Sequence, residues 1–172
     1  IALSTITEAV FARYRSSQKM LRKNLEKTYS SSKTHKKIPI HVATLEKGLY
    51  AAIMSCYAQG FELIQNTSKE NNWQVNMAEI ARIWEGGCII RASMLKTLHQ
   101  AYQKHSERHI LEIPLIRDQL IKYIPELEKT VINGIQNRVP LPTLSSSLSY
   151  LQSMTKDDSP ANFIQGLRDY FG

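Results

Sequence analysis

The sequence predicts an all-α fold, a multi-helix domain with a long central helix that covers residues 1–172 as one unit. Apolar residues recur every three or four positions in most segments, which is the period of an α-helix. No segment alternates apolar and polar residues between turns, and no glycine-rich loop joins a strand to a helix. With 42% hydrophobic and 22% charged residues, the composition is that of an ordinary globular domain. We therefore expect helices throughout.

The first fifth of the chain predicts one helix and one exposed connection. Thr5 and Glu8 form the Thr-x-x-Glu pattern of a capping box, which predicts a helix start at Thr5. An apolar stripe of Ile6, Val10 and Tyr14 follows at four-residue spacing. Residues 28–39 are polar, rich in serine and closed by a proline, so we expect an exposed connection there.

A long helix is predicted from His41 to about Asn71. One apolar stripe comprises Leu45, Leu49, Ile53, Cys56, Gly60 and Leu63, and a second comprises Tyr50, Met54, Tyr57 and Phe61. Two stripes indicate a helix covered on most sides, either at the centre of the domain or shared with a second subunit. Gly48 and Gly60 lower helix propensity, which suggests close crossings by neighbouring helices.

The next predicted helix opens with a second capping pattern, Asn76 and Glu79. Its apolar pattern continues through Gly86 and Gly87, where we expect a kink or a very close contact.

Four further helices are predicted in the second half. Residues 113–124 and 126–136 form two amphipathic helices hinged at Pro125, and the last two helices span residues 144–154 and 160–170. The segment RVPLPT predicts an extended turn before the last two.

Few residue groups favour chemistry on their own. Cys56 and Cys88 lie in apolar surroundings far apart in sequence, so we expect buried, reduced thiols. His105 and His109 have a metal-compatible spacing but no third ligand nearby, so we expect no metal site. The serines at 145–147 lack the motif of a serine nucleophile and are interpreted as caps and small packing residues.

The net charge of +7 lies entirely in the first fifth: residues 1–37 hold nine Lys and Arg against two Glu, and the rest holds thirteen of each sign. Such a cluster can face nucleic acid, anionic lipid or a small phosphorylated ligand, or it can simply be a solvated face. Nucleic-acid motifs are missing, and no apolar run reaches the length of a membrane span. We expect a soluble intracellular protein that binds neither nucleic acid nor membrane. A small phosphorylated ligand needs fewer groups, because two or three arginine guanidinium groups are enough to bind one phosphate.

Four stretches occur together and in order: TEAVFAR (7–13), YAQGFELI (57–64), IARIWEGGCIIRASML (80–95) and PANFIQGLRDYFG (160–172). They make the chain closely resemble the C-terminal helical domain of 6-phosphogluconate dehydrogenases over nearly its whole length. The resemblance implies a cytoplasmic homodimer whose full-length form oxidises and decarboxylates 6-phosphogluconate to ribulose 5-phosphate with NADP. It also implies that the Arg-Asp-Tyr-Phe-Gly segment begins a tail reaching the neighbouring subunit's active site.

Matched residue by residue, the resemblance assigns two substrate-binding residues to this chain. Arg13 falls on an arginine that binds the substrate from its own subunit, and Arg168 falls on the tail arginine that grips the substrate phosphate in the neighbouring subunit. A substrate-contacting histidine of the family lies two residues beyond the position of Gly172. The family's Rossmann domain and its catalytic lysine and glutamate also match nothing here, so no catalytic residue and no NADP contact is expected in this chain.

Two departures from the family pattern stand out. Glu85 replaces a usual arginine, which reverses a charge and is expected to rearrange a local ion pair. Gly166 and Leu167 replace Ala-Gln just before Arg168. Both suggest a divergent member.

Three hypotheses follow. The first is a piece of a 6-phosphogluconate dehydrogenase, since both ends look cut; alone, the 172-residue chain is expected to be inactive. The second is a stand-alone helical interaction module derived from that family. The third is a nucleic-acid binder, which requires an affinity that falls steeply with salt.

Overall fold

Helices form almost all of the chain in the computed structural model, which describes residues 4–29, 37–158 and 160–172, with Ala161 as backbone only. The elements are α1 (Ser4–Ser17), α2 (Lys19–Tyr29), α3 (Val42–Glu70), α4 (Met77–Gly87), α5 (Met94–Lys104), the 3-10 turn η1 (Ile110–Glu112), α6 (Pro114–Gln136), α7 (Pro142–Met154) and α8 (Pro160–Phe171). These described residues contain no β-strand. The all-α prediction is confirmed.

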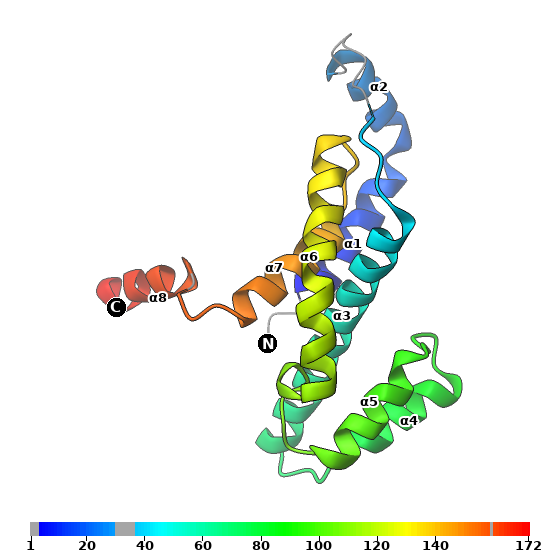
Figure 1. The fold of residues 1–172 in the computed structure, drawn as a ribbon. Helices are drawn as coiled ribbons and strands as arrows, with labels where there is room; N and C mark the ends of the chain where they lie inside the picture. Colours follow the sequence, from blue (N-terminus) through cyan, green and yellow to red (C-terminus); the bar gives the residue numbers. More distant parts are fainter. Residues whose placement is uncertain (1–3, 30–36, 159) are drawn as a thin grey trace.

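The two longest helices, α3 and α6, lie antiparallel at the centre, and α7 packs against both (Figure 1). α1 packs on α7, while α4 and α5 form a hairpin at the other end of α3. The fully buried core includes Met54 and Phe61 of α3, Leu98 of α5, Leu127 of α6 and Leu151 of α7. These side chains come from four helices, so one hydrophobic core holds the centre together.

Gly48 marks the closest approach of α3 and α6. A Cβ atom built on Gly48 would lie 2.7 Å from Thr130 Oγ1 and 3.2 Å from the Glu126 carbonyl oxygen. The predicted close crossing is therefore confirmed at Gly48. Within the described residues no helix crosses closely at Gly60, where a Cβ would meet only Trp84 at an ordinary 3.7 Å.

α3 matches its predicted span, but only one of its two apolar stripes is covered within the chain. Met54, Tyr57 and Phe61 are buried, whereas Leu45 and Leu49 are 40% and 52% exposed. The prediction of a helix covered on most sides therefore fails for the single chain. Its stripe through Leu49 remains open to another partner.

Several predicted boundaries are wrong for identifiable reasons. The double glycine ends α4 at Gly87, since the chain leaves the helix in an extended conformation at Cys88, and nothing lies within 4 Å of a Cβ at Gly86 or Gly87. The predicted close contact is absent, and residues 88–93 connect α4 to a separate α5.

α6 is continuous rather than hinged at Pro125. Pro125 has no backbone N–H, so the carbonyl oxygen of Ile121 loses its helical hydrogen bond. Both residues lie on the exposed side of α6, where water can donate to that oxygen instead. Packing of both halves of α6 against the core offsets the cost of the proline.

The N-terminal expectations need two corrections. Thr5 lies inside α1 rather than capping it, and its buried hydroxyl accepts a hydrogen bond of 2.9 Å from Gln59 Nε2. The predicted connection at 28–39 begins too early, since Thr28 and Tyr29 still belong to α2. Residues 30–36 of that connection lie outside the described residues.

Candidate functional site

Arg13 lies near the C-terminal end of α1, where hydroxyl groups satisfy the last carbonyls of the helix. Ser16 Oγ donates to the Arg13 carbonyl oxygen at 2.6 Å, and Arg22 Nη2 donates to the Ser16 carbonyl oxygen at 3.0 Å. Helix ends leave such carbonyls without intrahelical partners. These bonds lie at the end of α1 and tie α2 to it just beyond Arg13.

The surface around Arg13 is strongly positive. Arg15 pairs with Glu8 at 3.5 Å, but in the described part of the chain the Arg13 guanidinium has neither an ion-pair nor a hydrogen-bond partner. α2 adds four exposed cations, Lys19, Arg22, Lys23 and Lys27, against the single carboxylate of Glu26. Clustered cations create a field that attracts anions. Arg13 is thus available to a phosphate.

Arg168 lies in the last turn of α8 and is also exposed. The carboxylate of its neighbour Asp169 accepts a 2.8 Å hydrogen bond from Gln165 Nε2 one turn earlier, so that carboxylate has a partner on its own helix. Among the described residues, no carboxylate pairs with Arg168. Its guanidinium therefore keeps its donors available for an anion.

One copy of the chain does not bring Arg13 and Arg168 together. α8 extends away from the helices at the centre, and none of the described helices packs extensively against it (Figure 1). Its five large apolar side chains are all exposed: Phe163, Ile164, Leu167, Tyr170 and Phe171. An amphipathic helix normally buries such a face. The described residues therefore leave the apolar face of α8 uncovered.

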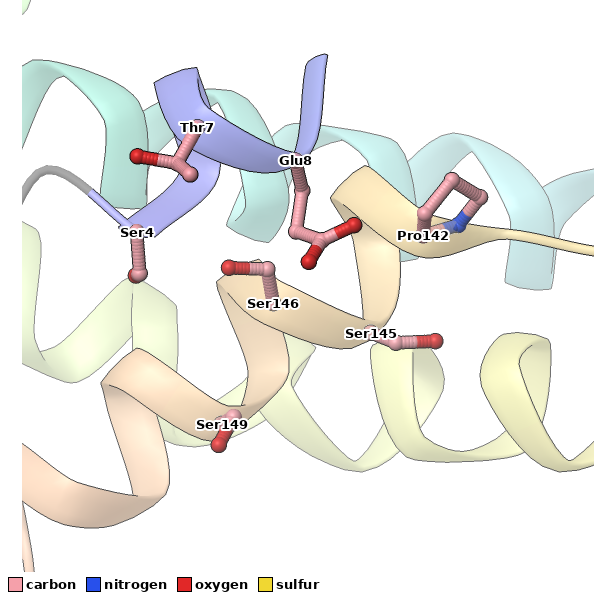
Figure 2. A pocket seen from close by; sticks show the side chains of 7 residues that line it. All are labelled: Ser4, Thr7, Glu8, Pro142, Ser145, Ser146 and Ser149. Atoms are coloured by element: carbon pink, nitrogen blue, oxygen red, sulfur yellow. The ribbon is translucent and has the colours of Figure 1, made fainter. Parts of the chain in front are cut away.

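A hollow of about 650 Å³ lies where α1 crosses α7 (Figure 2). Five hydroxyl side chains and Glu8 line it together with Pro142: the hydroxyls are those of Ser4, Thr7, Ser145, Ser146 and Ser149. The Glu8 carboxylate points from α1 toward α7 in Figure 2. Arg13 does not line this hollow. Ser145 and Ser146 lie inside α7 rather than capping it, whereas Ser147 is 1% exposed and packs in the core.

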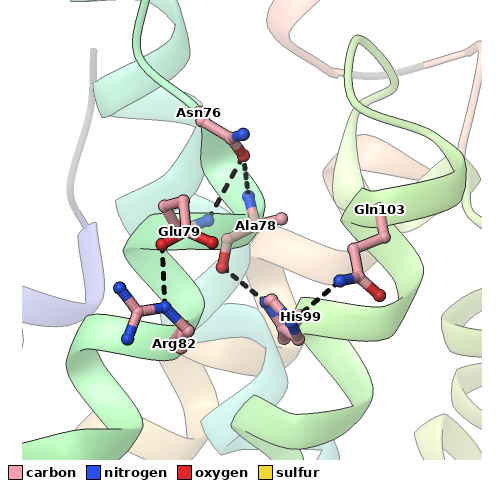
Figure 3. A network of polar contacts seen from close by, with 6 residues as sticks. All are labelled: Asn76, Ala78, Glu79, Arg82, His99 and Gln103. Atoms are coloured by element: carbon pink, nitrogen blue, oxygen red, sulfur yellow. Dashed lines mark hydrogen bonds and ion pairs between the residues drawn. The ribbon is translucent and has the colours of Figure 1, made fainter.

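The α4–α5 hairpin is held by a chain of polar contacts (Figure 3). Asn76 Oδ1 caps α4 by accepting from the backbone nitrogens of Ala78 and Glu79 at 2.9 and 3.2 Å, which confirms the predicted cap. The Glu79 carboxylate pairs with Arg82 at 2.7 Å instead of returning to the cap.

His99 joins the two helices of the hairpin. Its Nδ1 lies 2.8 Å from the Ala78 carbonyl oxygen, and its Nε2 lies 3.1 Å from Gln103 Nε2. A carbonyl only accepts and an amide nitrogen only donates, so these partners fit the neutral ring with its proton on Nδ1. His99 is thus a structural link between α4 and α5.

Glu85, the charge reversal noted in the sequence, forms the expected local ion pair. Lys96 Nζ of α5 lies 3.6 Å from Glu85 Oε1 of α4. The Lys96 side chain is 72% exposed, so the pair adds little to stability. Glu85 does not touch either arginine of the candidate site.

The cysteine prediction is half right. Both thiols are free, but Cys56 is exposed and Cys88 partly so, rather than buried. Partial desolvation raises the pKa of the Cys56 thiol, and hydrogen bonds with Ser147 and Ser55 partly offset this rise. A thiol with a raised pKa is a weak nucleophile at neutral pH.

His105 and His109 do not share a helical turn, since His105 follows α5 and His109 caps η1. His109 Nδ1 accepts from the Leu111 backbone nitrogen at 3.3 Å. Within the described ranges, no group of three or more His, Cys, Asp or Glu side chains is placed to hold a metal ion.

One polar cluster was missed in the sequence. Glu62 of α3 lies 3.9 Å from His109 Nε2 and accepts a hydrogen bond of 3.5 Å from the Tyr150 hydroxyl. Tyr102 lies in the same region and is 1% exposed. Its pKa is raised mainly by burial and also by the electrostatic effect of Tyr150. These residues are 40 or more positions from Glu62 in sequence, so no local pattern could have linked them to it.

The fold and sequence match one family throughout. Residues 1–172 match the family model described as 6-phosphogluconate dehydrogenase, C-terminal domain. Decarboxylating 6-phosphogluconate dehydrogenases of Staphylococcus epidermidis and Staphylococcus aureus are 37% and 38% identical over 177 aligned residues. Each match covers 100% of this chain and 37% of the relative, so the chain spans just over a third of the length of these curated relatives.

A solved Plasmodium falciparum 6-phosphogluconate dehydrogenase has the same fold, with a TM-score of 0.89 and 34% identity over 100% of this chain and 38% of that one. That enzyme was solved in its apo form, with its cofactor NADP+ and with its substrate 6-phosphogluconate. The family model, the relatives and the helical architecture agree, and the chain belongs to the 6-phosphogluconate dehydrogenase family, in which it corresponds to the C-terminal domain.

Proposed function

We propose that this chain is the substrate-side domain of a cytoplasmic decarboxylating 6-phosphogluconate dehydrogenase. The full-length protein oxidises 6-phosphogluconate with NADP+ and releases carbon dioxide to give ribulose 5-phosphate. The chain's own part is to bind the substrate phosphate and to form contacts between two copies. The observation that carries the proposal is that Arg13 and Arg168, the two positions matched to substrate-binding arginines, have no anionic partner among the described residues.

Arg13 and Arg168 bind the phosphate through charge-assisted hydrogen bonds. A guanidinium group presents a planar fork of donors that fits phosphate oxygens, and two forks can surround one phosphate. Arg13 acts from α1 of one copy and Arg168 from α8 of its partner. The exposed apolar face of α8 supports such a homodimer, because it is a surface that an amphipathic helix normally buries.

NADP is expected to bind elsewhere in the full-length protein. Dinucleotides sit on a glycine-rich turn between a strand and a helix, and the described residues contain no strand. When bound, NADP+ accepts the hydride. No residue of this chain is assigned to hold it, and no proton transfer of the reaction is assigned to this chain.

A membrane role finds no support in the helices. None of those described is both long enough and apolar enough to cross a bilayer.

The test is turnover by the purified full-length protein with 6-phosphogluconate and NADP+, followed by NADPH absorbance and by carbon dioxide release. We expect both products in equal amounts. Absence of turnover together with absence of 6-phosphogluconate binding in calorimetry would reject the proposal and favour the non-catalytic interaction module.

A further inference from the structure

An open apolar groove of about 500 Å³ runs along α3 beside the beginning of α1. Its floor is the stripe of α3 that remains uncovered, with Ile53, Cys56, Gly60 and Leu63 in line. Spacings of three and four residues place these side chains on one seam of the helix. Small residues at Cys56 and Gly60 make the seam a shallow channel, which is the shape that admits a crossing helix.

The walls of the groove are apolar and largely uncovered. Ile6 of α1 is 57% exposed and Ile89, after α4, is 99% exposed, although both line the groove. Arg91 is the only charged residue in the lining. Apolar side chains left this open mark a docking surface in a soluble protein.

We infer that this groove receives an apolar helix from the part of the full-length protein that precedes residue 1. The inference rests on the proposed function, because it requires the chain to be the C-terminal part of a longer dehydrogenase. It assigns the open seam of α3 to packing within one subunit, and leaves α8 and the positive surface near Arg13 for contacts with a second copy.

The position of the groove favours an occupant from the same chain. Thr5 and Ile6, in the first turn of α1, line it, so the groove lies beside the N-terminal end of α1. The relatives extend well beyond the match, since 177 aligned residues are only 37% of their length. A covalently attached segment acts at an effective concentration of about millimolar, which a separate copy does not reach in dilute solution.

Gln59 provides a second observation. It lines the groove, is 3% exposed, and donates through Nε2 to Thr5 Oγ1, yet its Oε1 has no hydrogen-bond partner in the described part of the chain. An unpaired buried acceptor costs about 1–3 kcal/mol. A donor from the arriving helix would relieve that cost, given a small adjustment of the amide.

The test uses the full-length protein and the thiol of Cys56 as the probe. Alkylation of Cys56 by iodoacetamide is followed by mass spectrometry of its peptide, with the urea-unfolded protein as the reference for full access. We expect Cys56 to react at least about 100-fold more slowly in the native protein, with the same protection when the protein is diluted below the concentration at which it dissociates into single chains. Protection that disappears on dilution would assign the groove to a second copy, and a lack of protection would mean that nothing covers it; either result overturns the inference.

A variant tests the fit of the groove. Gly60→Leu adds bulk to the channel, and a Cβ at this position meets only Trp84, at an ordinary 3.7 Å. We expect the alkylation of Cys56 to rise at least about tenfold, because the docked helix is displaced. Ser153→Leu, at an exposed position of α7, is the matched control and should leave the rate unchanged. An unchanged alkylation rate in Gly60→Leu would contradict the inference. The proposed function is tested separately, by turnover of 6-phosphogluconate.

Discussion

Gly48 and Thr130 stand at the crossing of α3 and α6, where a single added carbon on the glycine would come within 2.7 Å of the threonine hydroxyl oxygen. Thr130 Oγ1 already donates to the Glu126 carbonyl oxygen at 2.8 Å, so it is not free to move away. The absence of a side chain at Gly48 therefore sets the distance between the two central helices.

Gly48→Ala is expected to destabilise the fold by about 1–3 kcal/mol, because overpacking at the crossing outweighs the gain in helix propensity of about 1 kcal/mol. Urea unfolding followed by circular dichroism measures the change. Gly166→Ala in α8 is the control, since nothing lies within 4 Å of its added carbon, and it should be neutral or slightly stabilising. A stable Gly48→Ala protein would show that the crossing is looser than described.

The cap of α4 gives a second prediction. Asn76→Ala removes the acceptor of the Ala78 and Glu79 backbone donors and should lower the free energy of unfolding by about 1 kcal/mol. Glu85→Ala, which breaks only the exposed pair with Lys96, should cost less than about 1 kcal/mol. Thermal unfolding of the two variants compares the effects. An equal or larger loss for Glu85→Ala would contradict the assignment of the cap as the stronger interaction.

The buried hydroxyl of Tyr102 gives a prediction that depends on pH. No described group bonds to it, so Tyr102→Phe should be neutral or stabilising by up to about 1 kcal/mol at pH 7. The ring contact with Phe61, at 4.9 Å between centroids, can be kept by phenylalanine. A loss of more than about 1 kcal/mol at pH 7 would mean that the hydroxyl has a partner after all.

Above pH of about 10 the wild-type protein should lose stability. Burial raises the pKa of Tyr102 in the folded state, so the unfolded chain releases the proton first and is favoured as the pH rises past the ordinary tyrosine value. Tyr102→Phe should lose less stability over this range. Urea midpoints of both proteins at neutral and alkaline pH measure the difference, and parallel curves would argue against a raised pKa.

Local sequence patterns predicted the helices well because periodicity and capping residues act within a few positions. The spans of α3 and α8, the cap at Asn76 and the crossing at Gly48 are all as predicted. The predictions at the double glycine and at Pro125 were wrong. A glycine pair ends a helix as readily as it bends one, and here it ends α4. A proline on the exposed side of a helix can be tolerated, and α6 continues through Pro125.

Tertiary relationships were harder to predict from the sequence. Periodicity marks an apolar face but not what covers it, so the open stripe of α3 and the exposed face of α8 became visible only in the fold. Thr5 pairs with Gln59, 54 positions away, and no capping pattern predicts that contact. The roles of Arg13 and Arg168 came from family resemblance, since an exposed arginine has no local signature of phosphate binding.

The proposed roles of the two arginines predict a large loss of substrate binding when either is removed. Arg13→Ala and Arg168→Ala, made in the full-length protein, should each raise the KM for 6-phosphogluconate by about 10-fold or more, because a charge-assisted bond to phosphate contributes about 1.5–3 kcal/mol. Steady-state kinetics measures this. Arg15→Ala is the control, since Arg15 is already paired with Glu8.

Mixing the Arg13→Ala and Arg168→Ala proteins tests most directly whether the arginines act across two subunits. If Arg13 of one copy and Arg168 of its partner serve one site, each mixed dimer contains one intact site and one doubly altered site. Random exchange makes half of the dimers mixed, so about a quarter of wild-type activity should return at limiting substrate. No recovery after verified subunit exchange would contradict the account, because it would place both arginines in the same subunit's site or in none.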